Sequence, residues 1–168
     1  RLYMDKRHIH FVSFDVPYPP DYGGIIDVYY HLKSLHELGI NITLHCFYYQ
    51  GNNPPNEKLE AFCANINYYH RKKHVGKMLA SKLPFIVATR NDKNLLKNLS
   101  MDNSPILFSG LQTCYFLAHP SLKDRVKIVR AHNIEHDYYR GLSMAESNLM
   151  KKQYYLWEAS KLEKFESK

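Results

Sequence analysis

The stretch His8–Gly39, HIHFVSFDVPYPPDYGGIIDVYYHLKSLHELG, decides the fold of this chain. It opens with an apolar run, Ile9–Phe14, that has the length and composition of a short buried strand. A turn-rich segment, Val16–Gly24, follows and ends in two glycines. Apolar residues then recur at the spacing of one helix face, and Gly39 stands where a helix C-cap glycine would. The next run, Ile40–Tyr48, predicts a second strand, so the whole segment is one βαβ unit. The apolar helix positions are Ile25, Val28, Tyr29, Leu32, Leu35 and Leu38.

The pair Gly23–Gly24 lies where open parallel sheets bind ligands, outside the carboxyl end of a strand and at the start of a helix. Glycine has no Cβ, so another molecule can approach its backbone closely. The N-terminus of the helix behind the pair favours negative charge. The loop does not read G-x-G-x-x-G, so a dinucleotide fingerprint is not supported. A rigid βα connection without any ligand is the alternative interpretation.

Strands alternate with helices along the rest of the chain, which predicts an α/β fold: a Rossmann-like parallel sheet flanked by helices. The length of 168 residues suits a single domain, residues 1–168. Either Asn91 or Asp92 could cap a helix. Further strands are expected at 66–70, 105–108 and 126–131. Helical patterns cover 57–64, 74–100 with a break at Pro84, 111–117, a segment opening at Tyr138, and 144–168.

Composition and motifs exclude several classes of protein. Cys46, Cys63 and Cys114 form no C-x-x-C pair, so zinc-finger and dithiol motifs are unsupported, and their use fits a reducing cytoplasm. No apolar run approaches the length of a membrane span, and no signal peptide is expected at the start. The chain contains neither the G-x-S-x-G elbow of α/β-hydrolases nor a Walker A loop.

The net charge of +7 favours polyanions or anionic membranes as partners. Basic residues gather within His70–Lys82, which we call the basic segment. A solvated surface is one interpretation of the basic segment, and contact with an anionic membrane is the functional one that we favour. Nucleic acid is not an expected partner, because no helix-turn-helix, RNP or zinc-finger motif accompanies the charge.

Three segments fall at the carboxyl ends of predicted strands: Asp15–Gly24, Ser109–Thr113 and His132–Asp137. In a doubly wound sheet these loops share one edge and can meet. His132 and His136 are candidate proton acceptors, and Glu135 could orient one of them. A metal site built on the two histidines, or a purely structural turn, are the competing interpretations.

Two motifs make the chain resemble the N-terminal half of bacterial GT-B glycosyltransferases, most closely the retaining GT4 family. The first is the proline-containing loop Phe14–Gly24, followed by His31–Leu35 and by Leu38-Gly39. The second is R-x-H-N-I-E-x-x-Y-Y, matched from Arg130 to Tyr139. Together the two motifs span most of the chain.

The resemblance implies two Rossmann-like domains with a cleft between them. The N-terminal domain of such enzymes mainly binds the acceptor, and the C-terminal domain holds the nucleotide-sugar donor. This chain would supply only the first domain and would be inactive alone. The donor motif of the family, two glutamates separated by seven residues, belongs to the other half. Glu158 and Glu166 have this spacing in the wrong half, so we treat the match as chance.

Site residues carried over from the family lie at the predicted sheet edge. Gly23 and Gly24 would face the donor phosphates and the transferred sugar, and their amides could stabilise charge on the departing diphosphate. His132 is the expected catalytic residue. Many relatives carry a histidine on the loop after the fourth strand, where this chain has Gln112. The residues expected to bind the acceptor are Tyr22, Gln112, Asn133 and Glu135.

The expected activity is that of a glycosyltransferase of the hexosyltransferase type, with a nucleotide sugar as donor and a glycan or lipid-linked acceptor. No metal and no cofactor are expected. Enzymes of this type often build surface polysaccharides, so the expected location is the cytoplasm, peripheral to the inner membrane face. A stand-alone α/β ligand-binding or regulatory module without catalytic activity is the alternative.

Overall fold

The computed structural model describes residues 7–49, 57–72, 76 and 80–167. Its centre is a five-stranded sheet in the order β3-β2-β1-β4-β5, and every neighbouring pair is parallel. The predicted α/β, Rossmann-like fold is confirmed. The strands are β1 (His8–Ser13), β2 (Asn41–Tyr48), β3 (Asn65–His70), β4 (Ile106–Ser109) and β5 (Lys127–Arg130).

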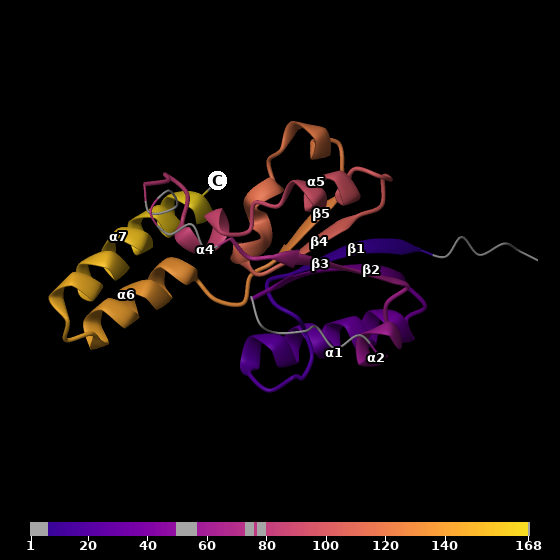
Figure 1. Cartoon of the computed structure of the whole chain (residues 1–168), viewed down its shortest axis with the longest axis horizontal. Coiled ribbons are helices and arrows are strands. Elements are labelled where there is room, and N and C mark those ends of the chain that lie inside the picture. Colours follow the sequence, from indigo (N-terminus) through magenta and orange to yellow (C-terminus); the bar gives the residue numbers. More distant parts are fainter. Residues whose placement is uncertain (1–6, 50–56, 73–75, 77–79, 168) are drawn as a thin grey trace, which may run out of the picture.

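Helices cover both faces of the sheet (Figure 1). α1 (Gly23–Glu37) and α2 (Glu57–Glu60) pack on one face. α5 (Lys93–Leu99) packs on the other face with two 3₁₀ helices, η1 (Leu111–Phe116) and η2 (Pro120–Leu122). α4 (Phe85–Ala88) and the antiparallel pair α6 (Glu135–Ala145) and α7 (Leu149–Glu166) lie beyond the carboxyl ends of the strands.

The central strands are apolar on both faces because each face is covered. Phe11 of β1 is fully buried against α1, where it joins Leu32 and Leu44. Its neighbour Val12 points to the opposite face and joins Phe108 and the buried leucines of α5. The chain therefore has two cores, one on each side of a single sheet.

The predicted end of α1 is confirmed at Gly39. The Gly39 amide donates to His36 O and the Ile40 amide donates to Leu35 O, at 2.9 and 3.1 Å. This is the Schellman pattern, and it places Gly39 at φ +74°, a conformation that glycine adopts without steric cost. The stop redirects the chain at once into β2.

Two helical predictions are wrong in their extent. In the stretch expected to be helical from 74 to 100, the described residues 80–84 are not helical, and only the short α4 and α5 form after them. Pro84 precedes α4, and Asp92 caps α5 by accepting from the Asn94 amide. The stretch 144–168 is likewise not one helix from its start, because α6 ends at Ala145 and Asn148 caps α7 by accepting from the Lys151 amide.

The edge strand β5 is poorly covered. Val126, Ile128 and Val129 are 63, 46 and 42 % exposed. β5 pairs with β4 on one side, and no strand among the described residues pairs with its other side. The apolar residues of β5 predict a buried strand, but the described residues leave their side chains partly exposed. None of the described helices combines the length and the apolar character needed to cross a bilayer.

Two glycine substitutions should change stability in opposite directions. Gly39→Ala forces a Cβ into the left-handed region, so we expect a loss of about 1 kcal/mol in the free energy of unfolding. Gly141→Ala lies inside α6 with no atom within 4 Å of the new Cβ, so we expect a gain of up to about 1 kcal/mol. Urea denaturation of both variants beside the parent protein measures the two effects. A neutral Gly39→Ala variant would contradict the turn geometry.

Candidate functional site

The side chain of Phe14 joins three loops at the carboxyl edge of the sheet. A Cβ added to Gly24 would lie 2.9 Å from Phe14 Cζ, and one added to Gly110 would lie 3.3 Å from Phe14 Cδ1. The Phe14 and His132 rings meet edge to face with centroids 5.7 Å apart. The loops after β1, β4 and β5 therefore converge on one aromatic ring. These loops are the three segments that the sequence placed at one edge of the sheet.

The two glycines at the start of α1 have different surroundings. Gly24 is closed off by Phe14, so its lack of a Cβ serves packing. Gly23 is exposed and has nothing within 4 Å of its Cβ position. Tyr22, the N-cap residue, makes no side-chain cap, and the first turn of α1 carries no acidic residue. The backbone amides at the start of α1, where Gly23 lies, therefore have no side-chain hydrogen-bond acceptor.

Tyr22 lies at the rim of this loop. Its hydroxyl donates to Asp15 Oδ2 at 3.1 Å, and the other oxygen of Asp15 accepts from the Val16 amide at 2.8 Å. Partial burial, together with the charge of Asp15, raises the pKa of Tyr22. The contact orders the loop that leads into Gly23.

His132 is held by partners on both ring nitrogens. Nε2 lies 3.0 Å from Ser109 Oγ and Nδ1 lies 3.4 Å from Asp27 Oδ2. Burial lowers the pKa of His132, Asp27 raises it and Arg130 lowers it. A neutral ring that donates from Nδ1 to Asp27 and accepts at Nε2 from Ser109 satisfies both contacts. A ligand could use His132 as a proton acceptor only by replacing one of these two partners.

Asp27 and Arg130 form the strongest ionic contact of this edge. The guanidinium donates to both oxygens of the carboxylate, at 2.9 and 2.7 Å, and so links β5 to α1. The pair holds the pKa of Asp27 below its usual value, chiefly through the hydrogen bond from Arg130. His31, one turn further along α1, has a buried Nδ1 without a partner among the described residues. Arg130 belongs to the R-x-H-N-I-E-x-x-Y-Y motif, whereas no motif in the sequence singled out Asp27.

A second group of contacts joins Gln112 to the start of α6. Gln112 Nε2 donates to Glu135 Oε1 at 3.3 Å, and its buried Oε1 has no partner among the described residues. Burial, reinforced by the nearby Glu166, raises the pKa of Glu135. Asn133 is exposed and hydrogen-bonds the Glu135 carboxylate. The structure thus brings Gln112, Asn133 and Glu135 together, as predicted from the sequence.

Arg90 is a buried residue of this edge that the sequence did not reveal. Its Nε and Nη2 donate to Phe14 O at 3.2 and 3.0 Å, and Nη1 donates to Ile86 O at 2.6 Å. Burial and the neighbouring Arg71 lower its pKa to about 10. Arg90 braces the loop that carries Phe14. It stands between two helical patterns, where no sequence signal separates a buried arginine from an exposed one.

Other sequence candidates lie apart from this group or act within the fold. His136 contacts Glu166, and no group of three possible metal ligands among the described residues includes His132 or His136. Glu166 also accepts from the Glu135 amide at 2.7 Å, so it caps α6. Glu158 accepts from the Phe85 amide at 2.7 Å and caps α4. The glutamate pair spaced by seven residues therefore has contacts inside this domain.

The basic segment lies partly outside the described residues. Of its described members, Arg71 donates from Nε to Thr89 at 2.9 Å and stacks on Tyr49 and Phe85. Lys72 donates to Asn91 O at 2.9 Å, and Lys82 is exposed. Arg71 and Lys72 thus help to hold the fold.

Comparison with known proteins gives one distant relative. The chain is 27% identical over 150 residues to an uncharacterized 44.6 kDa protein in the cps region of Klebsiella pneumoniae, a match that covers 88% of this chain. The chain spans 39% of the length of that relative. No protein-family model matches the chain, and no solved structure matches it.

The two charges beside His132 should move its pKa in opposite directions. Asp27→Asn removes the carboxylate that favours the charged ring, so the pKa of His132 should fall by roughly half a unit or more. Arg130→Gln removes the opposing cation, so the pKa should rise by a similar amount. NMR titration of the imidazole resonances measures both shifts, with the exposed Asp21→Asn as the matched control. Shifts of the same sign in the two variants would contradict the arrangement.

Proposed function

We propose that this chain is the acceptor-side domain of a glycosyltransferase, corresponding to the N-terminal half of a GT-B fold. The enzyme would move a sugar from a nucleotide-sugar donor to a glycan or lipid-linked acceptor in surface-polysaccharide synthesis. The observation that carries the proposal is the convergence of the α1 N-terminus, His132 and the Gln112–Glu135 contact around Phe14. The relative in a cps region supports a polysaccharide-related role.

The donor side of the proposed reaction needs a group that stabilises negative charge on the leaving diphosphate. The start of α1 fits this need, because its first amides have no side-chain acceptor and Gly23 leaves the approach open. Backbone amides at a helix N-terminus bind phosphate oxygens without any reorganisation during the reaction. The nearby Arg130 is paired with both oxygens of Asp27, so it could meet a phosphate only by releasing that carboxylate. In this proposal the nucleotide itself is held by the other half of the enzyme.

The acceptor side needs groups that orient a sugar hydroxyl. The unpartnered Oε1 of Gln112 is a hydrogen-bond acceptor. Burial and the nearby Glu166 raise the pKa of Glu135 beside it, and its carboxylate could accept a hydrogen bond from a sugar hydroxyl. His132 would take part if a ligand hydroxyl replaced Ser109 at Nε2. Tyr22 and Asn133 form the exposed rim of the same edge.

Gly23→Val separates the proposed role of this loop from stability. A Cβ at Gly23 meets no atom within 4 Å and the position is exposed, so the variant should fold with nearly unchanged stability. The rate of sugar transfer should nevertheless fall at least tenfold, because the new side chain blocks the approach of the donor phosphates to the α1 amides. The measurement is a mass-spectrometric screen of nucleotide sugars with the full-length protein and glycan or lipid-linked acceptors. Gly141→Ala is the control that should keep full activity.

Gly24→Val is less informative, because its Cβ would collide with Phe14 and disturb the fold as well as the site. Near-normal transfer by Gly23→Val would refute the role assigned to the loop. A full-length protein that consumes no nucleotide sugar with any acceptor would refute the glycosyltransferase itself.

We further propose that the basic segment holds the protein against the inner face of an anionic membrane, where lipid-linked acceptors lie. Changing Lys73, Lys77 and Lys82 to Glu should abolish co-sedimentation with vesicles that contain anionic lipid. Arg71 is left intact because it packs on Tyr49 and Phe85. Neutral vesicles are the control. Equal sedimentation of the parent and the triple variant would contradict the proposal.

A further inference from the structure

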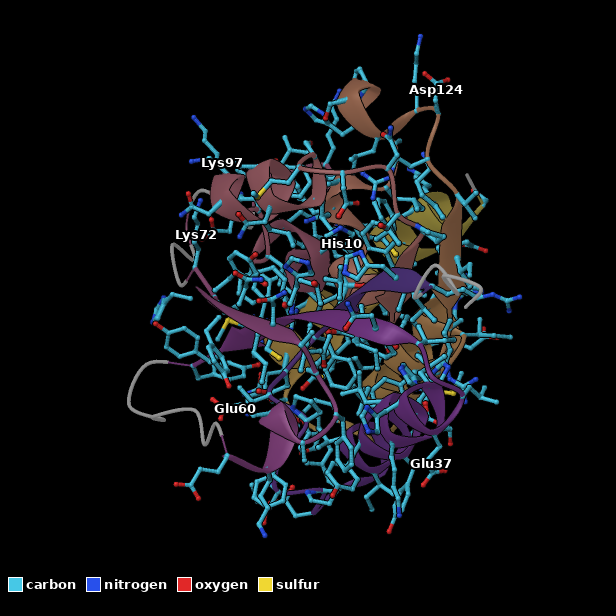
Figure 2. All side chains as sticks on the ribbon, turned by 90° about the vertical axis from the view of Figure 1, so that its right-hand side faces the viewer. His10, Glu37, Glu60, Lys72, Lys97 and Asp124 are labelled. Atoms are coloured by element: carbon cyan, nitrogen blue, oxygen red, sulfur yellow. The ribbon has the colours of Figure 1, made fainter. Side chains whose placement is uncertain are left out.

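A second group of polar side chains lies at the opposite, amino-terminal edge of the sheet. Asp102 Oδ1 lies 3.1 Å from His10 Nε2, and Asp102 Oδ2 lies 3.5 Å from His8 Nδ1. One ligand atom from each of these three residues lies within 4.8 Å of the other two. Figure 2, which views the molecule from the side where β1 begins, places His10 at its centre. We call His8, His10 and Asp102 the amino-edge triad.

The sheet itself fixes the triad. His8 and His10 are two residues apart on β1, so their side chains point to the same face. Asp102 lies in the turn between α5 and β4, and β4 pairs directly with β1. The Asp102 carboxylate accepts from the Ser104 amide at 2.7 Å, which orients it toward the histidines. The three ligand atoms therefore come from rigid neighbouring elements.

The far nitrogen of each histidine already has a partner. His8 Nε2 lies 2.8 Å from Thr43 Oγ1, and His10 Nδ1 lies 2.9 Å from His45 Nε2. A metal-bound histidine characteristically donates its second ring N–H to such a partner, which fixes its tautomer and orientation.

The chain of contacts continues through His45 to Tyr69 and Asn98. His45 Nδ1 lies 2.8 Å from Tyr69 Oη, and Asn98 Nδ2 donates to the same oxygen at 2.8 Å. Without a metal, Tyr69 donates to His45, His45 to His10 and His10 to Asp102, so every ring nitrogen is satisfied. With a metal on His10 Nε2, both imidazoles change tautomer, so that His10 donates to His45 and His45 donates to Tyr69 while no heavy atom moves. The Tyr69 hydroxyl hydrogen then turns away from His45. The surroundings can thus accommodate both states.

The triad opens on a cavity of about 340 Å³. The side chains of Asp102 and His8 are 42 and 23 % exposed, so an ion can reach them from solvent. Three asparagines and Met101 complete the lining, together with Thr43 and His45. The asparagines are Asn65, Asn67 and Asn98.

We propose that the amino-edge triad binds a divalent transition metal, with Zn²⁺ as the ion that suits it best. Two neutral imidazoles and one carboxylate are a common zinc ligand set, and they disfavour Mg²⁺ and Ca²⁺, which prefer oxygen ligands alone. Ligand atoms at tetrahedral zinc lie about 3.3 Å apart, given bonds of about 2.0–2.1 Å. One carboxylate oxygen, Asp102 Oδ2, lies 3.2 Å from His10 Nε2 and 3.5 Å from His8 Nδ1, and these two separations bracket that value. A water from the cavity would supply the fourth ligand.

Two contacts oppose the ion. Arg125 Nη2 lies 3.5 Å from Asp102 Oδ1, and its positive charge lowers the affinity of the carboxylate for a cation. His8 Nδ1 lies 2.8 Å from Ser104 Oγ, and that hydroxyl must turn away before the nitrogen can bind a metal. We therefore expect a dissociation constant on the order of micromolar, well above that of a closed structural zinc site.

Isothermal titration of the purified, tag-free protein with ZnCl₂, after chelator treatment and gel filtration, tests the proposal. We expect one equivalent of Zn²⁺ to bind and no uptake of Mg²⁺. His8→Gln and Asp102→Asn should each weaken binding at least tenfold. His36→Gln changes a histidine outside the triad and should bind like the parent. His10 is left unchanged because it is buried, and its loss could unfold the protein.

Thermal denaturation and Co²⁺ spectra give independent measurements. Zn²⁺ should raise the melting temperature of the parent and of His36→Gln, but not that of Asp102→Asn. Co²⁺ should show the visible bands of tetrahedral coordination only in proteins that retain the triad. The proposal would be overturned if the parent did not bind Zn²⁺. It would also be overturned if His8→Gln and Asp102→Asn bound Zn²⁺ as tightly as the parent does. Neither result bears on the sugar-transfer site, which lies at the other edge of the sheet.

Discussion

The position of the Phe14 ring is the contact on which the carboxyl edge of this protein depends. The ring fills the space between the start of α1 and the loops after β4 and β5. A Cβ at Gly24 would lie 2.9 Å from Phe14 Cζ, and one at Gly110 would lie 2.3 Å from Gln112 Oε1 and 3.3 Å from Phe14 Cδ1. Gly110 is doubly constrained, because its backbone also adopts φ +86°. Arg90 holds the Phe14 carbonyl from the other side with two hydrogen bonds. An aromatic residue at the end of β1 thus sets where every polar group of the edge can stand.

The two edges of the sheet use polar groups in different ways. At the carboxyl edge, charged residues from separate elements pair across the loops, as Asp27 does with Arg130, and unsatisfied or exposed groups stay beside them. At the amino edge, His10, His45 and Tyr69 form a buried chain of hydrogen bonds that ends on Asp102. The first arrangement leaves room for a ligand to compete for partners. The second is satisfied within itself, because each ring nitrogen of His10 and His45 already has a partner.

The sequence predicted the fold well because its strands are short apolar runs and Gly39 ends α1 unambiguously. It did not predict the break between α6 and α7, where Asn148 caps the second helix, because neither glycine nor proline marks the break. The loops that carry Gln112, Asn133 and Glu135 were predicted to meet because parallel strands bring their carboxyl ends to one edge. The choice of these three residues came from the resemblance to glycosyltransferases. Asp27 and Arg90 were missed because their partners lie far away in the chain. The pairing of His10 with Asp102, 92 residues apart, likewise depends on β1 lying beside β4.

The uncovered strand β5 has a practical consequence for work with this polypeptide in isolation. A parallel edge with free amides and exposed valine and isoleucine is a template for another strand. At the concentrations needed for crystallisation or NMR, neighbouring copies would satisfy that edge by pairing with one another. A charged substitution at Val126 or Ile128 would disfavour such pairing and help to keep isolated preparations soluble.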